Sequence, residues 1–560
     1  MSTFPTPSAL DASTQAFPVL TEAQISRIRS SGDLRRVEPG EILFRTGDSG
    51  LPFFVVLSGK MEIVQPDPKS TGERHIVTHA AGQFTGELAM ISGQRSLVMG
   101  RVLEAGEFLQ LTSESFRSLI ARDAELSEIF MRAFILRRLA LISHGYGNVV
   151  VMGSRHSADT LRLREFLTRN GHPHLFVDLD TDKDSQELLD RFAVKPEDVP
   201  VVICASQNIF RNPTTQQLAD CLGFNASMDD SHVRDVVIVG AGPSGLAAAV
   251  YAASEGLDAL VIESEAPGGQ AGSSSKIENY LGFPTGVSGQ ELASRAMTQA
   301  QKFGAKMMVG HSVVKLDCTR RPYQMVLDTG SSIAARAVII ATGAQYNKPP
   351  LDNLKRFEGL GVYYGATFME SQLCVGEEVV VIGGGNSAGQ AAVYLSQSAR
   401  RVYMLVRSSG LSETMSRYLI QRIDENPAIE LHCNTELSGL AGDSELERVT
   451  WMDKSTGESS ARDIRHVFIM AGASPRTQWL QGCLALDASG FILTGRDLEG
   501  AAHGSPRHSW PLPRSPYMLE SSQPGVFAVG DGRSGSVKRV ASAVGEGSIA
   551  VHLVHRVLTE

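Results

Sequence analysis

Asp235-Val-Val-Ile-Val239-Gly240-Ala-Gly242-Pro-Ser-Gly245 and Val379-Val-Val-Ile382-Gly383-Gly-Gly385-Asn-Ser-Ala388 are the two stretches that decide the fold. Each reads as an apolar strand, a glycine turn and the start of a helix. Such a turn lets the backbone approach a pyrophosphate, whose charge is stabilised by the N-terminus of the helix. Two fingerprints in one chain predict two bound dinucleotides, and the pair suggests hydride transfer from a nicotinamide to a flavin.

Length and composition describe an ordinary globular chain. With 560 residues, 42% hydrophobic and 20% charged, we expect three or four domains. The net charge of −9 argues against nucleic-acid binding. We see neither a leader peptide nor an apolar run long enough to span a bilayer. The six cysteines show no C-x-x-C and no metal-ligand spacing, so we expect no metal site and a reducing, cytoplasmic setting.

Periodicity divides the chain into modules. Short alternating segments predict a β-barrel or jelly roll over 15–142, closed by one helical stretch over roughly 113–142. A compact α/β unit follows over 146–224, with strands near 148–152, 174–178 and 200–204 and helices at 157–169, 184–192 and 214–222. From 233 onward the pattern alternates between strand and helix, which predicts two Rossmann-like α/β domains: 233–350 with 480–560, and an inserted 351–479.

Two acidic residues support the first fingerprint. Glu263 ends the next apolar strand, where a carboxylate suits the ribose hydroxyls of an adenosine. Asp531 follows Gly525-Val-Phe-Ala-Val-Gly530 and can accept a hydrogen bond from a ribitol hydroxyl. The alternatives are a glycine turn without a ligand and an ordinary cap, but strand, helix and acid fall in register here.

Residues 233–560 resemble the low-molecular-weight thioredoxin reductase family. The matching stretches are Gly240–Gly245, Pro267–Gln270, Ile277–Tyr280, Ala341–Gly343, Gly383–Ala388, Gly530-Asp531 and Arg539–Ala541. The resemblance implies a homodimer that binds FAD and NADPH. It implies FAD contacts from Gly240, Gly242, Gly245, Glu263, Gln270, Asn279, Asp531, Arg539, Val540 and Ala541, and NADPH contacts from Gly383, Gly385, Asn386, Ser387 and Ala388. The inserted domain would rotate on linkers near 345–352 and 474–480.

The second fingerprint favours NADPH over NADH. The strand Val402–Val406 runs into Arg407 rather than into an acid, and an arginine attracts the 2′-phosphate that an acid would repel. The family has His-Arg-Arg followed by a further arginine. Only Arg407 matches here, with Arg417 as a substitute. The alternative is that Arg407 is a solvated surface charge.

The family's redox pair is missing. Cys-Ala-Thr-Cys is replaced by Gly365-Ala-Thr-Phe368, and dithiol exchange needs two sulfurs within bonding reach. Cys374 is the one thiol nearby. A buried small hydrophobic residue is the favoured interpretation of it, and a catalytic thiol is the alternative.

The barrel resembles a cyclic-nucleotide-binding domain. Gly86, Glu87, Arg95 and Ser96 match its phosphate-binding cassette, where an arginine and a helix N-terminus hold the cyclic phosphate and a glutamate takes the ribose hydroxyl. We expect cAMP or cGMP as an effector. Because the spacing from Glu87 to Arg95 is short, a degenerate cassette used only for packing is the alternative.

The middle unit resembles a thioredoxin- or glutaredoxin-like domain. Asp198-Val-Pro200 stands where that fold usually has a cis-proline, whereas Ser154–Thr160 occupies the place of the redox motif and holds no cysteine. This unit would be a structural bridge or a platform for a thiol-containing partner.

Together these features predict an NADPH-dependent FAD oxidoreductase that resembles thioredoxin-disulfide reductase without its C-x-x-C. One alternative is an oxidase or diaphorase that passes electrons to oxygen, a quinone or an external carrier. Another is a non-catalytic flavin or nucleotide sensor. The acceptor is expected to be a small molecule or a protein.

Overall fold

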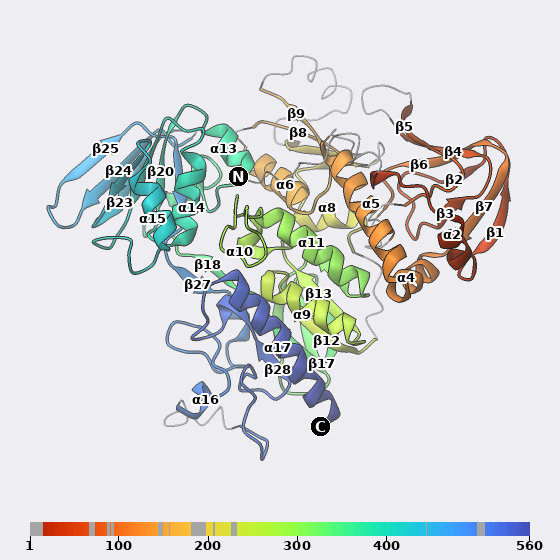
Figure 1. Cartoon of the computed structure of the whole chain (residues 1–560). Coiled ribbons are helices and arrows are strands. Elements are labelled where there is room, and N and C mark those ends of the chain that lie inside the picture. Colours follow the sequence, from red (N-terminus) through yellow and green to blue (C-terminus); the bar gives the residue numbers. More distant parts are fainter. Residues whose placement is uncertain are drawn as a thin grey trace. The chain divides into compact units, whose positions relative to one another are not determined.

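The computed structural model describes residues 15–66, 73–86, 90, 95–143, 149–155, 157–180, 198–204, 208–225, 232–443, 445–500 and 510–560 (Figure 1). The chain forms two compact units, one made largely of residues before 229 and the other largely of residues after it. Within the described ranges, no helix combines the length and apolar character that a bilayer-spanning segment needs.

The N-terminal part consists of two antiparallel sheets, of order β1-β7-β3 and β2-β6-β4-β5. The helices complete the core of this part, because buried phenylalanines from strands, loops and helices pack together there. They are Phe53, Phe84, Phe116, Phe130 and Phe134. The elements are α2 (Glu22–Arg29), β1 (Asp33–Val37), β2 (Ile42–Phe44), β3 (Phe53–Val56), β4 (Lys60–Pro66), β5 (Glu73–His79), β6 (Met99–Glu104), β7 (Gly106–Leu111), α4 (Ser113–Arg122) and α5 (Ala124–Ser143).

The helical stretch expected over roughly 113–142 is confirmed, and it consists of two helices, α4 and α5. Asp123 adopts an extended conformation between them, with φ −111° and ψ 101°. Its carboxylate accepts a hydrogen bond from the backbone N–H of Leu126 at 3.0 Å. This side chain therefore satisfies a donor in the first turn of α5, which favours a new helix start there.

The middle unit is a four-stranded sheet of order β11-β10-β8-β9. β8 and β9 are parallel, whereas β10 is antiparallel to both of its neighbours. The Val199–Pro200 peptide bond before β10 is cis. The three expected strands are confirmed; the helix expected at 184–192 lies outside the described residues. The elements are β8 (Val149–Gly153), α6 (Ala158–Arg169), β9 (Leu175–Asp178), β10 (Val201–Cys204), β11 (Asn208–Arg211) and α8 (Thr215–Leu222).

The first α/β module is built on a sheet of order β14-β13-β12-β17-β16-β15, with β28 paired to β17. β13, β12, β17 and β28 are parallel, so their carboxyl ends meet at one edge. The elements are β12 (Arg234–Val239), α9 (Pro243–Ser254), β13 (Ala259–Glu263), α10 (Gly269–Gly272), α11 (Gly289–Lys302), β14 (Lys306–Val309), β15 (Val313–Asp317), β16 (Tyr323–Leu327), β17 (Ser332–Ile340), α16 (Asp497–Gly500), β28 (Val526–Ala528), η4 (Gly530–Gly532) and α17 (Val540–Thr559).

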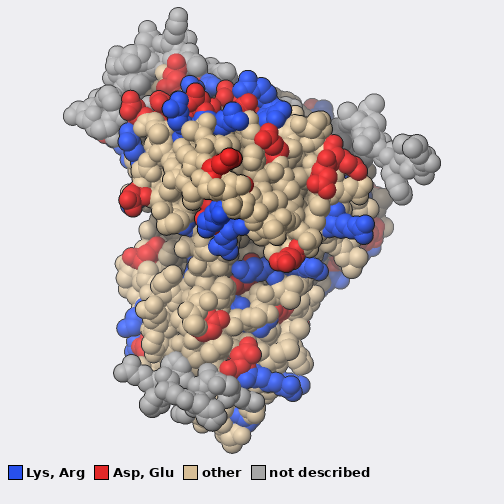
Figure 2. Space-filling view, turned by 90° about the vertical axis from the view of Figure 1, so that its left-hand side faces the viewer, with Lys and Arg blue, Asp and Glu red and all other residues tan. Residues whose placement is uncertain are grey.

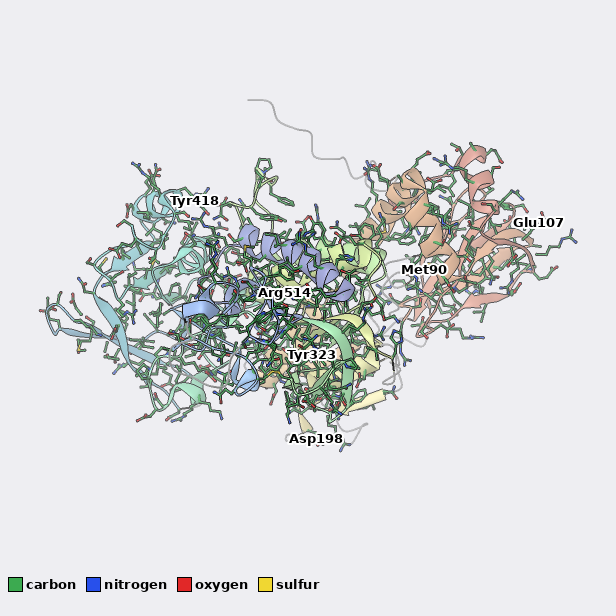
Figure 3. All side chains as sticks on the ribbon, turned by 90° about the horizontal axis from the view of Figure 1, so that it is seen from below. Met90, Glu107, Asp198, Tyr323, Tyr418 and Arg514 are labelled. Carbon is green, nitrogen blue, oxygen red and sulfur yellow. A yellow bond between two sulfur atoms is a disulfide. The ribbon has the colours of Figure 1, made fainter. Side chains whose placement is uncertain are left out.

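An ion-pair cluster stabilises the C-terminal half of this module, and one disulfide joins that half to the N-terminal half. Arg514 (labelled in Figure 3) forms ion pairs with fully buried Glu520 at 2.7 Å and with the C-terminal Glu560 at 2.8 Å. Cys318, after β15, forms a disulfide with Cys483, with a Cα–Cα distance of 5.8 Å. The two cysteines are 165 residues apart, and no sequence pattern connects them.

The second α/β module has a parallel sheet of order β19-β26-β20-β21-β22 and an antiparallel sheet β23-β24-β25. Basic and acidic side chains are interspersed on the face shown in Figure 2. The elements are α12 (Leu354–Phe357), β19 (Val362–Tyr363), α13 (Phe368–Leu373), β20 (Glu378–Ile382), α14 (Asn386–Leu395), β21 (Arg401–Leu405), α15 (Arg417–Asp424), β22 (Ile429–His432), β23 (Thr435–Ala441), β24 (Arg448–Asp453), β25 (Ser459–Arg462), β26 (His466–Ile469) and η2 (Gln478–Leu480).

The two linkers between the modules lie side by side. β18 (Ala344–Tyr346) pairs antiparallel with β27 (Ala473–Pro475). The first residues of the segments expected to act as hinges, 345–352 and 474–480, therefore pair in a two-stranded ribbon.

Candidate dinucleotide sites

The first fingerprint forms the tight turn that its glycines predict. Gly240 has φ +103°, and a Cβ added to it would lie 2.4 Å from the Ala341 carbonyl oxygen. A Cβ on Gly245 would lie 1.9 Å from the Gly240 oxygen. A Cβ on Gly242, by contrast, would meet no atom within 4 Å, and no side chain caps α9. The uncapped N–H groups of α9 thus face open space, as a pyrophosphate site requires.

Glu263 is buried at the end of β13 and is already engaged by the turn. Its carboxylate accepts hydrogen bonds from the backbone N–H of Ala241 at 2.7 Å and of Glu265 at 2.9 Å. The acid predicted to bind a ribose therefore also fixes the position of the fingerprint backbone.

Asp531 belongs to the C-terminal part of the chain and lies near the first fingerprint. A Cβ on its neighbour Gly530 would lie 2.6 Å from Ser244 Oγ in α9, and one on Gly532 would lie 3.3 Å from the Gly343 oxygen. Burial raises the pKa of the Asp531 carboxyl, Lys538 lowers it and Glu546 raises it. No donor among the described residues reaches this carboxylate, so a ligand hydroxyl would supply one that the fold lacks.

The remaining FAD candidates have different surroundings. Gln270 Nε2 donates to the Ala344 oxygen at 2.6 Å, and Asn279 is exposed. Arg539 is the N-cap of the 20-residue helix α17 and has no capping side-chain hydrogen bond. Arg539 and Ala541 are exposed and Val540 is partly buried, so the first turn of α17 is open to a ligand.

The second fingerprint repeats this geometry. Gly383 has φ +138°, and an added Cβ would lie 2.5 Å from the Met470 oxygen and 3.1 Å from the Cβ of buried Ala388. Gly385 is the N-cap of α14 and provides no side-chain cap. An added Cβ there would meet only the Thr414 oxygen, at 4.0 Å, so the helix start is open in the same way.

A polar loop after β21 holds the second turn, and the sequence argument missed its members. Thr414 Oγ1 donates to the Gly384 oxygen at 2.7 Å, and Asn386 Oδ1 accepts from the Ser416 N–H at 2.7 Å. Ser387 shares a hydrogen bond with Tyr346 of the linker ribbon. The serines and threonines between Arg407 and Arg417 were the available signal, since such side chains commonly bond to nearby backbone groups.

Arg407 and Arg417 flank this loop. Arg407 follows β21, whose Leu405 pairs with Ile382 just before the fingerprint. Both arginines are exposed, and in the described part of the chain neither has an acidic partner. Two unpaired guanidinium groups beside an uncapped helix suit a phosphate.

The position of the family's redox pair contains no thiol. A Cβ on Gly365 would lie 3.6 Å from Ser273 Oγ, so this turn lies against the residue that follows α10. Thr367 N–H donates to Glu370 at 2.9 Å. Cys374 is fully buried, and burial, with Glu370 and Glu377, raises the pKa of its thiol well above the ordinary value. Cys374 is therefore held as a protonated packing residue.

Two of the cassette residues, Gly86 and Ser96, form hydrogen bonds with other parts of the barrel. Gly86 has φ +116°, and its carbonyl oxygen accepts a hydrogen bond from buried Arg137 of α5 at 2.8 Å. The Ser96 hydroxyl donates to the Val98 carbonyl oxygen at 2.8 Å. Arg95 is exposed, with its side chain over Gly223, and Glu87 lies outside the described residues.

Comparison with known proteins agrees with this geometry. Residues 234–547 match the model of the pyridine nucleotide-disulphide oxidoreductase family. The chain belongs to this family. It is an NAD(P)H-dependent flavoprotein oxidoreductase resembling thioredoxin reductases. Residues 34–123 match the cyclic nucleotide-binding domain.

Named relatives of this oxidoreductase include thioredoxin reductases. The Bacillus subtilis thioredoxin reductase is 32% identical over 334 residues, 60% of this chain and 97% of the relative. The Arabidopsis thaliana NADPH-dependent thioredoxin reductase 3 is 30% identical over 370 residues, 63% of this chain and 65% of the relative. The crystal structure of Lactococcus lactis thioredoxin reductase matches with a TM-score of 0.52 and 26% identity, over 58% of this chain and 99% of that one.

Proposed function

We propose that this oxidoreductase takes electrons from NADPH through bound FAD and passes them to an acceptor without using a dithiol at the family position. The observation that carries the proposal is the segment Gly365–Phe368, which contains no thiol and whose Gly365 lies next to Ser273, together with the fully buried Cys374. Bound FAD supplies the redox chemistry. The chain's own residues bind its pyrophosphate at α9, offer Asp531 to its ribitol and present the start of α17 beside it.

NADPH rather than NADH is the proposed donor. Arg407 and Arg417 are exposed and have no acidic partner among the described residues. A guanidinium group forms strong, bidentate hydrogen bonds with phosphate, so both can serve the 2′-phosphate.

Oxygen, a quinone or an external carrier is the proposed class of acceptor. A thioredoxin-like protein acceptor, which the names of the relatives suggest, would need a thiol route other than the family's. A non-catalytic sensor is the remaining alternative. We further propose the domain limits 15–142, 146–224, 233–350 with 480–560, and 351–479, a thioredoxin-like fold for 146–224, a homodimer, and regulation by a cyclic nucleotide.

Anaerobic titration with NADPH, followed by absorption, tests the donor half. Flavin bleaching at one equivalent, then reoxidation by oxygen or a quinone but not by thioredoxin, is the expected result. No bleaching would favour the sensor. Rapid thioredoxin reduction that Cys374→Ser abolishes would overturn the proposed route.

A further inference from the structure

The carboxylate of Glu546, in the second turn of α17, contacts both sides of the turn that carries Asp531. One of its oxygens accepts a hydrogen bond from the Gly530 N–H at 2.6 Å, and the other accepts one from the Arg533 guanidinium at 2.6 Å. Gly530 precedes Asp531 in the sequence and Arg533 follows it. A single carboxylate of α17 therefore holds the whole of η4 from both sides.

This contact is largely removed from solvent. The side chains of Glu546 and Arg533 are 13% and 17% exposed. Burial limits screening by salt, and hydrogen bonds between charged groups are stronger than neutral ones. Arg533 also donates to the Ser534 carbonyl oxygen at 2.9 Å, so the backbone after the turn orients its guanidinium. The pair is thus better ordered than an exposed ion pair between two long side chains.

Two glycines bring α17 and the Asp531 turn close to α9. A Cβ on Gly547 would lie 2.2 Å from the Ser244 carbonyl oxygen, and a Cβ on Gly530 would lie 2.6 Å from Ser244 Oγ. Both positions therefore require the absence of a side chain. Glu546, next to Gly547 in the sequence, lies where α17, α9 and the turn meet.

These three elements are the ones expected to contact FAD. α9 begins at the pyrophosphate turn, Asp531 is the candidate for a ribitol hydroxyl, and α17 begins with the candidates Val540 and Ala541. The Asp531 carboxylate accepts no hydrogen bond from the described residues. Its place is therefore set by the backbone on either side of it, which is the backbone that Glu546 holds.

We propose that Glu546 is a positioning residue for FAD and that it acts through Asp531. By holding Gly530 and Arg533, it presents the Asp531 carboxylate to the ribitol chain at a fixed place relative to the starts of α9 and α17. The bond to the Gly530 N–H carries this role, and Arg533 keeps the Glu546 carboxylate turned toward it. The inference rests on FAD binding at the first fingerprint, as in the proposed function.

A double-mutant cycle on the full-length protein tests this proposal. The dissociation constant of FAD is measured by titrating the FAD-free forms of wild type, Glu546→Ala, Asp531→Ala and the double variant. Glu546→Ala should weaken FAD binding about tenfold or more, because it removes hydrogen bonds to a charged group. In the Asp531→Ala background the same substitution should change the affinity by about twofold at most. Additive losses would overturn the proposal, because a residue that acts only on general stability shows no coupling to Asp531.

The conservative variant Glu546→Gln separates the two contacts. Its side-chain oxygen can still accept from the Gly530 N–H, whereas the charge opposite Arg533 is gone, so it should retain an affinity for FAD near that of wild type. Equal losses in Glu546→Gln and Glu546→Ala would contradict the assignment of the Gly530 bond. If FAD-free Glu546→Ala does not fold, the rate of FAD release from the purified holoproteins supplies the same cycle.

Glu255→Ala is the matched control. Glu255, at the end of α9, pairs with His555 of α17 at 2.9 Å, so the variant also breaks a contact between these helices but away from the turn. It should leave FAD affinity unchanged, and a loss equal to that of Glu546→Ala would overturn the proposal.

Failure of the proposed function is recognisable separately from failure of this inference. If the wild-type protein binds no FAD, both fail. If it binds FAD and the losses are additive, only the role of Glu546 fails.

Discussion

The Glu263 carboxylate accepts a hydrogen bond from the Ala241 N–H across the first fingerprint, with an Oε2–N distance of 2.7 Å. The bond holds the glycine turn in the conformation that leaves the start of α9 open. Glu263→Ala should therefore weaken FAD binding. Loss of a hydrogen bond to a charged group costs about 1.5–3 kcal/mol, which corresponds to at least about tenfold in affinity.

FAD content per chain after purification, and reconstitution of the FAD-free protein, measure this effect. Glu291→Ala is the control, because Glu291 is an exposed residue of α11 that pairs with Arg295. Wild-type FAD content in Glu263→Ala would refute the role of this bond.

Asp531→Asn should stabilise the FAD-free protein and weaken its binding of FAD. Burial raises the pKa of the Asp531 carboxyl, so folding disfavours its ionised form. The FAD-free protein therefore loses stability as the pH rises through the folded-state pKa, and it is best stabilised below the unfolded value. The asparagine removes that charge and should raise the Tm of the FAD-free protein at neutral pH, while FAD binds about tenfold more weakly.

Thermal unfolding of FAD-free protein across acidic to neutral pH checks this prediction. The difference in Tm between wild type and Asp531→Asn should shrink toward low pH. A difference that does not change with pH would show that Asp531 is not responsible.

Arg407→Ala should raise the KM for NADPH and leave that for NADH nearly unchanged. A lost contact to a charged phosphate costs about 1.5–3 kcal/mol, which is about tenfold to a hundredfold. Steady-state kinetics with both nucleotides measure it. Arg400→Ala is the control, since exposed Arg400 pairs with Glu378. Equal effects on both nucleotides would exclude the phosphate role; Arg417→Ala tests the second candidate in the same assay.

A cyclic nucleotide should slow alkylation of Cys221. The pKa of the Cys221 thiol is lowered chiefly by a hydrogen bond with Cys204 and in addition by the charge of Arg95, and a bound phosphate would draw the Arg95 guanidinium away from the thiol. Titration with cAMP or cGMP, followed by timed iodoacetamide labelling and by Tm, checks this, with Arg101→Ala as the control. If neither nucleotide changes the labelling rate of Cys221 or the Tm, and Arg95→Ala also changes neither quantity, the cassette does not bind a cyclic nucleotide.

Breaking the Arg422–Glu278 ion pair should speed flavin reduction by NADPH. This pair links α15 to the first α/β module, in the arrangement where Gly365 lies against Ser273. If the second module rotates, Arg422→Ala removes an interaction that favours this arrangement. Partly exposed pairs contribute up to about 1 kcal/mol, so the expected change is about fivefold at most. Stopped-flow absorption measures it.

The matched control is Arg401→Ala, which breaks the Arg401–Glu430 pair inside the second module. Equal rates for wild type and Arg422→Ala would show that the pair does not restrain the module.

Local patterns predicted much of this fold and part of the site. The strand, turn and helix around Gly240 and Gly383 follow from backbone requirements confined to a dozen residues, so they were predictable. Arg137 was not, because only the packing of α5 brings its guanidinium to the Gly86 carbonyl at 2.8 Å. The same holds for Arg95, whose side chain lies over Gly223 at the end of α8, since contacts between distant elements leave no local spacing to detect.

The sequence also does not show which of several nearby hydrogen-bond partners a polar side chain contacts. Asn386 is predicted to contact a nucleotide, and its side chain in addition accepts a hydrogen bond from the Ser416 N–H at 2.7 Å. Ser96 is predicted to lie at a phosphate, and its hydroxyl donates to the Val98 carbonyl oxygen at 2.8 Å. Residue type and position are readable from sequence, whereas the choice among several nearby partners depends on the folded backbone.

The Cys318–Cys483 disulfide makes the second α/β module a covalently closed loop inserted between two tethered ends. A protease cut anywhere between these cysteines would open the ring without releasing a fragment. Under non-reducing electrophoresis the nicked chain would migrate near full length, and only reduction would separate the pieces. The flavin-binding halves would thus stay joined even after their insert had been severed.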